Sequence, residues 1–143
     1  MAPRSLITLL VTVSLASAGS AEPATPGCSD SSRECLVRAA TSYLDAITQH
    51  DGSLAWLAPD VHRRVNGSEL EGEEAIRSAI DHEPEMIGYR DARFFVNERE
   101  GWVVVFWLID LDGPVTARIA ERFKIENGLI TEIEGVASRD PAE

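Results

Sequence analysis

A single carboxylate stands in the middle of an apolar row in the segment VTARIAERFKI, residues 115–125. Because the side chains of a β-strand alternate between two faces, one face of this segment carries Ala117, Ile119, Glu121, Phe123 and Ile125. Burial among apolar groups raises the pKa of a carboxyl, which suits a general acid or base. The alternative is a structural ion pair, in which Arg93, on the same strand face as Phe95, lowers the pKa of Glu121 and holds the sheet.

The segment VHRRVNG, residues 61–67, carries the other polar side chains that could act with Glu121. In an extended chain His62, Arg64 and Asn66 share one face. We expect Arg64 and Asn66 to hold a substrate oxygen or an activated water near Glu121. His62 is a further candidate base, because a histidine pKa lies near neutrality. The simpler interpretation is an Asn-Gly turn with solvated basic side chains, and Asn66 also begins a glycosylation sequon.

Several kinds of catalytic machinery are missing from the sequence. It has no serine or cysteine nucleophile with a histidine at a recognisable spacing, no glycine-rich phosphate loop and no metal-binding signature. The three histidines are scattered along the chain. We therefore expect neither a cofactor nor a metal.

The first 21 residues have the pattern of a secretory signal peptide. MAPR is a basic start, SLITLLVTVSLASA is an apolar run, and small residues allow cleavage after Ala18 or Ala21. Cleavage would remove Arg4, the only charged side chain there, so the net charge would move from −11 to −12. We expect a secreted or periplasmic protein that binds neither nucleic acid nor, after cleavage, a membrane.

The only two cysteines, Cys28 and Cys35, lie close together in the segment CSDSSREC. In an exported protein such a pair most often forms a disulfide. No histidine lies nearby to complete a zinc site. We expect residues 22–35 to form a flexible N-terminal arm that the Cys28–Cys35 disulfide holds in place.

Apolar periodicity predicts helices first and strands afterwards. Residues 36–50 and 71–82 have the pattern of amphipathic helices, and tight-turn signals separate four later strand-like runs: YRDARFFVN, WVVVFWLIDL, VTARIAERFKIE and LITEIEGV. This order predicts an α+β domain with helices on one face of a curved antiparallel sheet. The run WVVVFWLIDL is apolar on both faces, and helices can cover only one. We expect the other face to meet the chain's own arm or a second copy, and we favour a homodimer.

These elements, in this order, resemble the nuclear transport factor 2-like superfamily, particularly its SnoaL-like branch and an uncharacterised subset of secreted relatives. The segment YLDAITQHDGSLAWLAPDV is similar to the family's first helix and the connection that follows it. GEEAIRSAI is similar to its G-x-x-A-I helix, and ERFKIENGLITEIEG to its closing hairpin. The resemblance covers residues 36–138, with 139–143 as a tail. It implies a cone-shaped curved sheet wrapped around N-terminal helices, a cystatin-like roll.

The resemblance also implies an apolar pocket inside the cone, lined by Tyr43, Arg93, Trp107, Ile119 and Phe123. Members of the superfamily include ketosteroid isomerases, scytalone dehydratases, epoxide hydrolases and polyketide cyclases, as well as non-catalytic binding modules. The epoxide hydrolases and cyclases commonly use an acidic residue near the end of the last strand, where this chain has Gly135.

Two functions follow from these expectations. The first is a cofactor-independent isomerase, cyclase or hydrolase of a small apolar molecule, in which Glu121 moves a proton while Arg64, Asn66 and Arg93 hold an oxygen. The second is a non-catalytic carrier or a dimeric interaction module on the same fold. The sequence leaves both open.

Overall fold

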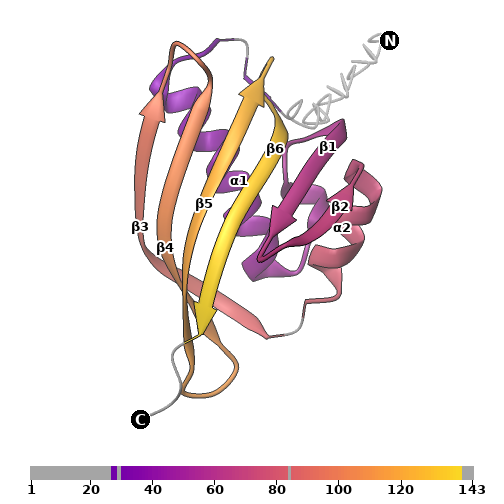
Figure 1. Cartoon of the computed structure of the whole chain (residues 1–143), viewed down its shortest axis with the longest axis vertical. Helices are drawn as coiled ribbons and strands as arrows, with labels where there is room; N and C mark the ends of the chain where they lie inside the picture. Colours follow the sequence, from indigo (N-terminus) through magenta and orange to yellow (C-terminus); the bar gives the residue numbers. More distant parts are fainter. Residues whose placement is uncertain (1–26, 29, 84, 140–143) are drawn as a thin grey trace, which may run out of the picture.

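The computed structural model describes residues 27–28, 30–83 and 85–139. These residues form two α-helices, a short 3₁₀ helix and six strands (Figure 1). In chain order they are α1 (Arg33–Gln49), η1 (Gly52–Leu54), β1 (Leu57–Val65), β2 (Ser68–Glu71), α2 (Glu73–Asp81), β3 (Met86–Asn97), β4 (Trp102–Leu111), β5 (Thr116–Glu126) and β6 (Leu129–Arg139). Both expected helices and the four later strands are confirmed. The expected signal peptide, residues 1–21, lies outside the described residues.

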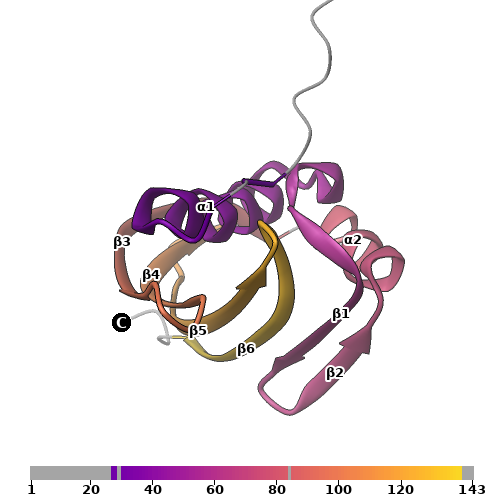
Figure 2. The same cartoon turned by 90° about the horizontal axis from the view of Figure 1, so that it is seen from above.

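The six strands form one curved sheet in the order β2-β1-β6-β5-β4-β3. All neighbouring pairs are antiparallel except β1 and β6, which are parallel. Seen from above, the sheet curls around α1 and does not close (Figure 2). The expected α+β cone is therefore confirmed, although the sheet is mixed rather than wholly antiparallel. Parallel neighbours need a long connection between them, and the chain from β1 to β6 provides it.

Helix α1 supplies most of the cover for the concave face of the sheet. The Ser32 hydroxyl caps its N-terminus by accepting a hydrogen bond from the Cys35 backbone nitrogen at 3.3 Å. The helix therefore begins inside the stretch that was expected to be a flexible arm. Its buried side chains pack against the inward residues of the strands, and the most enclosed of them are Leu36, Ala39, Ala40, Tyr43, Leu44 and Ala46.

Strand β4 shows how differently the two faces of the sheet are covered. Its inward side chains are buried: Val103, Val105, Trp107 and Ile109. On the outward side Phe106 is 50% exposed and packs edge to face against Phe95 of β3, which is 58% exposed. No helix among the described residues packs on this outer face, where Trp102, Val104 and Leu108 are half-buried and Phe106 is exposed.

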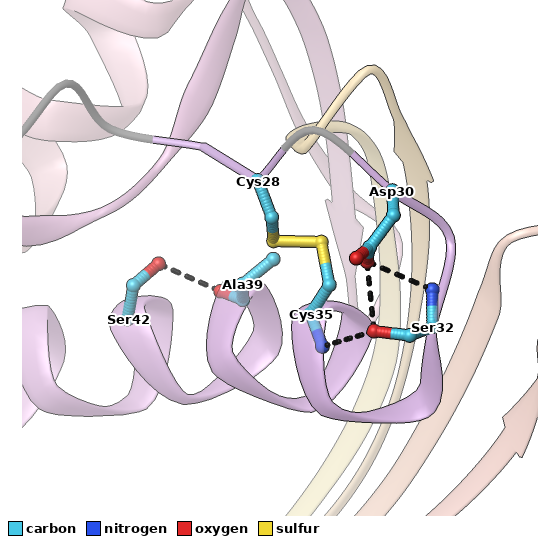
Figure 3. The surroundings of a disulfide bond; sticks show 6 residues. All are labelled: Cys28, Asp30, Ser32, Cys35, Ala39 and Ser42. Atoms are coloured by element: carbon cyan, nitrogen blue, oxygen red, sulfur yellow. Dashed lines mark hydrogen bonds between the residues drawn. A yellow bond between two sulfur atoms is a disulfide. The ribbon is translucent and has the colours of Figure 1, made fainter.

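Cys28 and Cys35 form a disulfide, as the sequence predicted (Figure 3). The bridge fastens the chain before α1 to the first turn of that helix. The fastened segment lies directly on the turn between β5 and β6, because a Cβ atom placed on Gly128 would lie 2.2 Å from the Cys28 backbone nitrogen. Gly128 also has a φ of 76°, in the left-handed region that favours glycine.

Replacement of Gly128 by alanine should destabilise the chain by displacing this fastened segment. Gly67 is the matched control, because it also follows an asparagine in a turn, has a φ of 81° and has open space where a Cβ would lie. Both variants bear the cost of a left-handed alanine, about 1–2 kcal/mol. Overpacking should cost Gly128→Ala about 1 kcal/mol or more beyond that in the free energy of unfolding, measured with urea. Equal losses in the two variants would show that the segment does not press on the turn.

Candidate functional site

Glu121 occupies the middle of β5 and points to the concave side of the sheet, as the alternating pattern predicted. Only 3% of the residue is exposed, and Ile119 and Phe123 on the same strand face are buried beside it. Gly135 of β6 lies directly across the ladder. A Cβ atom at Gly135 would lie 2.5 Å from Glu121 Cγ. The glycine therefore leaves the space that the side chain of Glu121 fills.

Three side chains from three other elements interact with this carboxyl: Arg63 from β1 and Trp107 from β4 act on it, and its charge in turn acts on Tyr43 from α1. Arg63 Nε donates a hydrogen bond to the Tyr43 hydroxyl oxygen at 2.8 Å. The Tyr43 ring packs edge to face against Phe123, with ring centres 5.4 Å apart. Trp107 packs in the same way against Tyr89 at 5.8 Å. Aromatic rings therefore lie beside one carboxyl and one guanidinium.

The surroundings of Glu121 favour its neutral form. Burial raises the pKa of Glu121 from its usual 4.5 to about 7, while the charge of Arg63 and the nearby indole of Trp107 act in the opposite direction. Neither Glu121 Oε2 nor Trp107 Nε1 has a hydrogen-bond partner of good geometry among the described residues. A carboxyl that titrates near neutrality and keeps one oxygen unpartnered is suited to take up and release a proton.

Contrary to the expectation from the sequence, Arg64 and Asn66 do not stand beside this carboxyl. Arg64 forms an ion pair with Glu69 of β2 at 2.6 Å. The Asn66 side chain donates a hydrogen bond to the backbone oxygen of Ala137 and accepts one from its nitrogen. The alternation along β1 turns Arg63 inward, and Arg64 and His62 consequently face the other side of the sheet.

Arg64, Asn66 and Glu121 nevertheless border one open groove of about 500 Å³. The groove lies on the outer face, because the β5 residues on either side of Glu121, Ala120 and Arg122, also line it and point away from the core. The carboxyl of Glu121 lies on the opposite side of the strand, near Tyr43. The groove and the buried carboxyl are therefore separate features.

Four of the five residues expected to line an inner pocket are buried on the concave side: Tyr43, Trp107, Ile119 and Phe123. Arg93 is the exception, since it is exposed on the outer face and lines a hollow of about 250 Å³ beside Phe106. Its neighbours Phe94 and Val96 pack against the core, which turns Arg93 outward. The expected ion pair between Arg93 and Glu121 is therefore wrong.

Arg63 is the member of this cluster that the sequence analysis did not select. It lies between Val61 and Val65 on the inward face of β1, so it is a single charge in an apolar row. The same pattern drew attention to Glu121. His62, Arg64 and Asn66 on the opposite face of β1 formed a longer row of polar residues, and the prediction therefore chose the face that points away from Glu121.

Two further findings concern the described residues. None of their His, Cys, Asp and Glu side chains gather in a group of three or more that could hold a metal ion. No helix among them is long and apolar enough to cross a membrane.

Residues 29–137 match a protein family described as a domain of unknown function, DUF8021. The chain belongs to the DUF8021 family. The match includes both Arg63 and Glu121. No curated protein matches this DUF8021 chain in sequence.

Solved structures resemble the DUF8021 chain in fold. An NTF-2 like protein of unknown function from Burkholderia xenovorans is 17% identical, with a TM-score of 0.65 over 77% of this chain and 87% of that one. A putative ketosteroid isomerase from Kribbella flavida is 16% identical, with a TM-score of 0.64 over 77% and 82%. An LEH-like epoxide hydrolase from M. tuberculosis is 18% identical, with a TM-score of 0.60 over 73% and 84%. The nuclear transport factor 2-like fold is thereby confirmed, and identities this low show the fold alone.

The buried carboxyl should make the chain less stable as the pH rises. Between pH 4.5 and about 7 the folded state keeps the proton of Glu121 and the unfolded state loses it, because the pKa is raised only in the folded state. The free energy of unfolding therefore falls with pH, by about 3 kcal/mol in total, and levels off above about pH 7.

Glu121→Gln, which imitates the neutral carboxyl, should lack this fall in stability. Glu134→Gln, at an exposed position on the outer face, should retain it. Urea denaturation at several pH values between about 4 and 8 measures the difference. Parallel stability curves for Glu121→Gln and the unsubstituted chain would contradict the raised pKa.

Proposed function

We propose that this DUF8021 chain is a cofactor-independent enzyme of the isomerase, cyclase or hydrolase type that acts on a small apolar molecule. One observation carries the proposal: a carboxyl with a pKa of about 7 is enclosed by aromatic side chains and keeps one oxygen unpartnered. Burial of an unpaired carboxyl lowers stability. Groups kept in such surroundings are concentrated at sites of proton transfer.

In this proposal Glu121 moves a proton between two positions of the substrate, or removes one from a water molecule. Arg63 is the cation that acts on Glu121, so it can stabilise an oxygen that becomes negative in the transition state. Tyr43 fixes the guanidinium through its bond to Nε. Arg63 takes the role that the sequence analysis gave to Arg64 and Asn66.

The comparisons support this class of function and leave the substrate open. Two of the fold neighbours are named as a putative ketosteroid isomerase and an LEH-like epoxide hydrolase. Both names describe reactions on organic molecules. The same fold is shared by a protein of unknown function, so the assignment depends on the carboxyl rather than on the fold.

The test is base catalysis on 5-nitrobenzisoxazole, an apolar probe that opens to a coloured nitrophenolate when a base removes its carbon-bound proton. The chain should accelerate this opening, with a rate that rises with pH through about 7 as Glu121 ionises. Glu121→Gln should lower the rate by about 100-fold or more, which is typical for one positioned proton-transfer group. Glu134→Gln should keep the full rate, because its side chain is exposed on the outer face.

A non-catalytic carrier is the rival function, and the same variants separate the two. A carrier would bind the probe without opening it, and Glu121→Gln would bind it equally well. Ala117→Phe, which adds bulk to the concave side, would block binding to either kind of protein. Binding without acceleration at any pH between about 6 and 9 would replace the enzyme with the carrier.

We also propose that the chain forms a homodimer through the outer face of the sheet. Exposed apolar side chains gather there: Phe95, Phe106 and Val136 are 58%, 50% and 64% exposed. Charges of both signs flank them, and Arg122 and Glu134 lie 2.5 Å apart. An apolar centre with both signs of charge around it can pair with a copy of itself about a two-fold axis.

Phe106→Asp should convert this dimer to a monomer, because it places a charge in the centre of the apolar face. Leu54→Asp is the control, since Leu54 is also an exposed apolar residue but belongs to η1. Sedimentation velocity at roughly 10 μM should show a dimer for the unsubstituted chain and for Leu54→Asp, given the affinity expected of a stable interface. A monomer for the unsubstituted chain would exclude the dimer.

We place the protein outside the cytosol, in a secreted or periplasmic location. The disulfide between Cys28 and Cys35 supports this placement, because such bonds persist in oxidising compartments. The signal-peptide pattern of residues 1–21 points the same way. The mass of the exported chain would reveal whether cleavage follows Ala18 or Ala21.

A further inference from the structure

Arg63 stands apart from the arginines that form ion pairs. In the described part of the chain, five arginines each have a carboxylate partner: Arg64, Arg77, Arg90, Arg122 and Arg139. Arg63 is more deeply placed, and its hydrogen bond there is the one from Nε to Tyr43. No carboxylate of the described residues forms an ion pair with the two terminal nitrogens of its guanidinium.

The carboxyls that act on Arg63 do so from beyond ion-pair distance. Burial opposes its charge, but Tyr43, Glu121 and Glu83 outweigh that effect and raise the pKa of Arg63. A partly buried cation without a direct partner lowers stability. Side chains that lower stability in this way are expected at functional sites, where they bind a substrate or another ligand.

The carboxyl of Glu121, which interacts with Arg63, also has an unpaired hydrogen-bond acceptor. Glu121 is 3% exposed, and its Oε2 has no partner among the described residues. The two side chains influence one another electrostatically without forming an ion pair. A polar group of a ligand that lies between them would satisfy both.

Two alanines lie on the inward face of β5 and β6 beyond Glu121. Along the inward face of β6, Gly135 and Ala137 are followed by Arg139, and the β5 residues that face these three are Glu121, Ile119 and Ala117. These residues lead to the end of the sheet where β5 begins and β6 ends (Figure 1). Ala117 and Ala137 therefore add little side-chain bulk on this side of the carboxyl, and Arg139, which forms an ion pair with Glu85, stands at the outer edge.

We propose that this site recognises a small apolar molecule that carries a carboxylate, with the carboxylate held by the two terminal nitrogens of Arg63. The inference rests on the proposed function for its site, and it adds the substrate class. A guanidinium presents parallel N–H groups that match the two oxygens of a carboxylate. The apolar part of the molecule then lies along the small residues of β5 and β6.

The bound anion would set the starting state of Glu121. The groups that face this carboxyl are Tyr43 from α1, Arg63 from β1, Trp107 from β4 and the bare backbone of Gly135 from β6. Of these only Arg63 carries a charge near neutral pH. Once a ligand carboxylate engages that charge, Glu121 is held protonated and acts first as a proton donor. Binding of an anionic ligand should therefore take up one proton per site above about pH 7.

The test compares a matched pair of probes, 1-naphthaleneacetate and 1-naphthaleneacetamide, which differ in the charge of one end. Titration calorimetry with the full exported chain should show that the acid binds about tenfold more tightly or better than the amide, because hydrogen bonds to charged groups are stronger than those to neutral ones. Acetate, benzoate and decanoate extend the series in size. Calorimetry in two buffers of different ionisation enthalpy counts the protons taken up.

Arg63→Gln should abolish the preference for the acid. Arg63→Lys should keep only part of it, because an ammonium does not present the two parallel N–H groups that match a carboxylate. Arg64→Gln is the matched control, since the next residue along β1 is an exposed arginine paired with Glu69, and it should bind as the unsubstituted chain does. A thermal melt of each variant checks folding. If Arg63→Gln does not fold, Arg63→Lys against Arg64→Gln decides the question.

Equal affinity for the acid and the amide would overturn the proposal, as would a failure of all four acids to bind below about 1 mM. An equal loss in the Arg63 and Arg64 variants would overturn it as well. The outcome is separate from that of the proposed enzyme. Acid binding that needs Arg63, without catalysis by Glu121, would retain the carboxylate site and reject the enzyme. Catalysis on neutral probes without a preference for acids would do the reverse.

Discussion

The enclosure of one carboxyl between α1 and the curved sheet is the constraint on which the rest of this structure depends. A carboxylate in that position loses its hydration, so the folded chain favours the protonated form and the pKa of Glu121 rises to about 7. The neighbouring strand must also leave room for the side chain, and Gly135 does so because a Cβ there would lie 2.5 Å from Glu121 Cγ. The residue on β6 is thus determined by the residue on β5.

The curvature that creates the enclosure comes from irregular strand pairing. The register shifts between Leu57 and His62 of β1, between Arg90 and Arg93 of β3, and between Lys124 and Ile125 of β5. Irregularities of this kind bend a strand and increase its twist. Bending toward α1 gives the sheet a concave face that one helix can cover. It also leaves a convex face that the described residues do not cover, so the same geometry produces both the buried carboxyl and the exposed aromatic pair.

Much of this architecture could be predicted from the sequence because period-2 and period-3.6 patterns survive wherever one face is buried. The row from Ala117 to Ile125 placed Glu121 on the correct face, and the apolar stripe of α1 placed Tyr43. The prediction failed where both faces of a strand carry apolar and polar residues, because the pattern then does not show which face points inward. In β3, apolar residues lie on both faces around Arg93, and a bulge shifts the alternation. Tertiary packing decided the orientation there, and single-strand periodicity does not contain that information.

The same limit explains why Arg63 was missed and Arg64 was chosen. Both are arginines on one strand, and only the pairing of β1 with β6 assigns the inward face, since Arg63 lies opposite the buried Ile133. A parallel pair between the first and last strands brings together residues far apart in the chain, which local patterns do not encode.

The chemistry of the site follows from the distance that the fold keeps between its two charges. If Arg63 and Glu121 formed a direct ion pair, the pKa of Glu121 would be low and the pair would be only structural. In the structure Arg63 Nε instead donates a hydrogen bond to the Tyr43 hydroxyl oxygen at 2.8 Å, which commits one edge of the guanidinium to α1. Tyr43 is in turn held by its edge-to-face contact with Phe123, the second residue after Glu121. Arg63 is therefore near enough to influence the carboxyl without forming an ion pair with it, so both side chains can still bind a ligand.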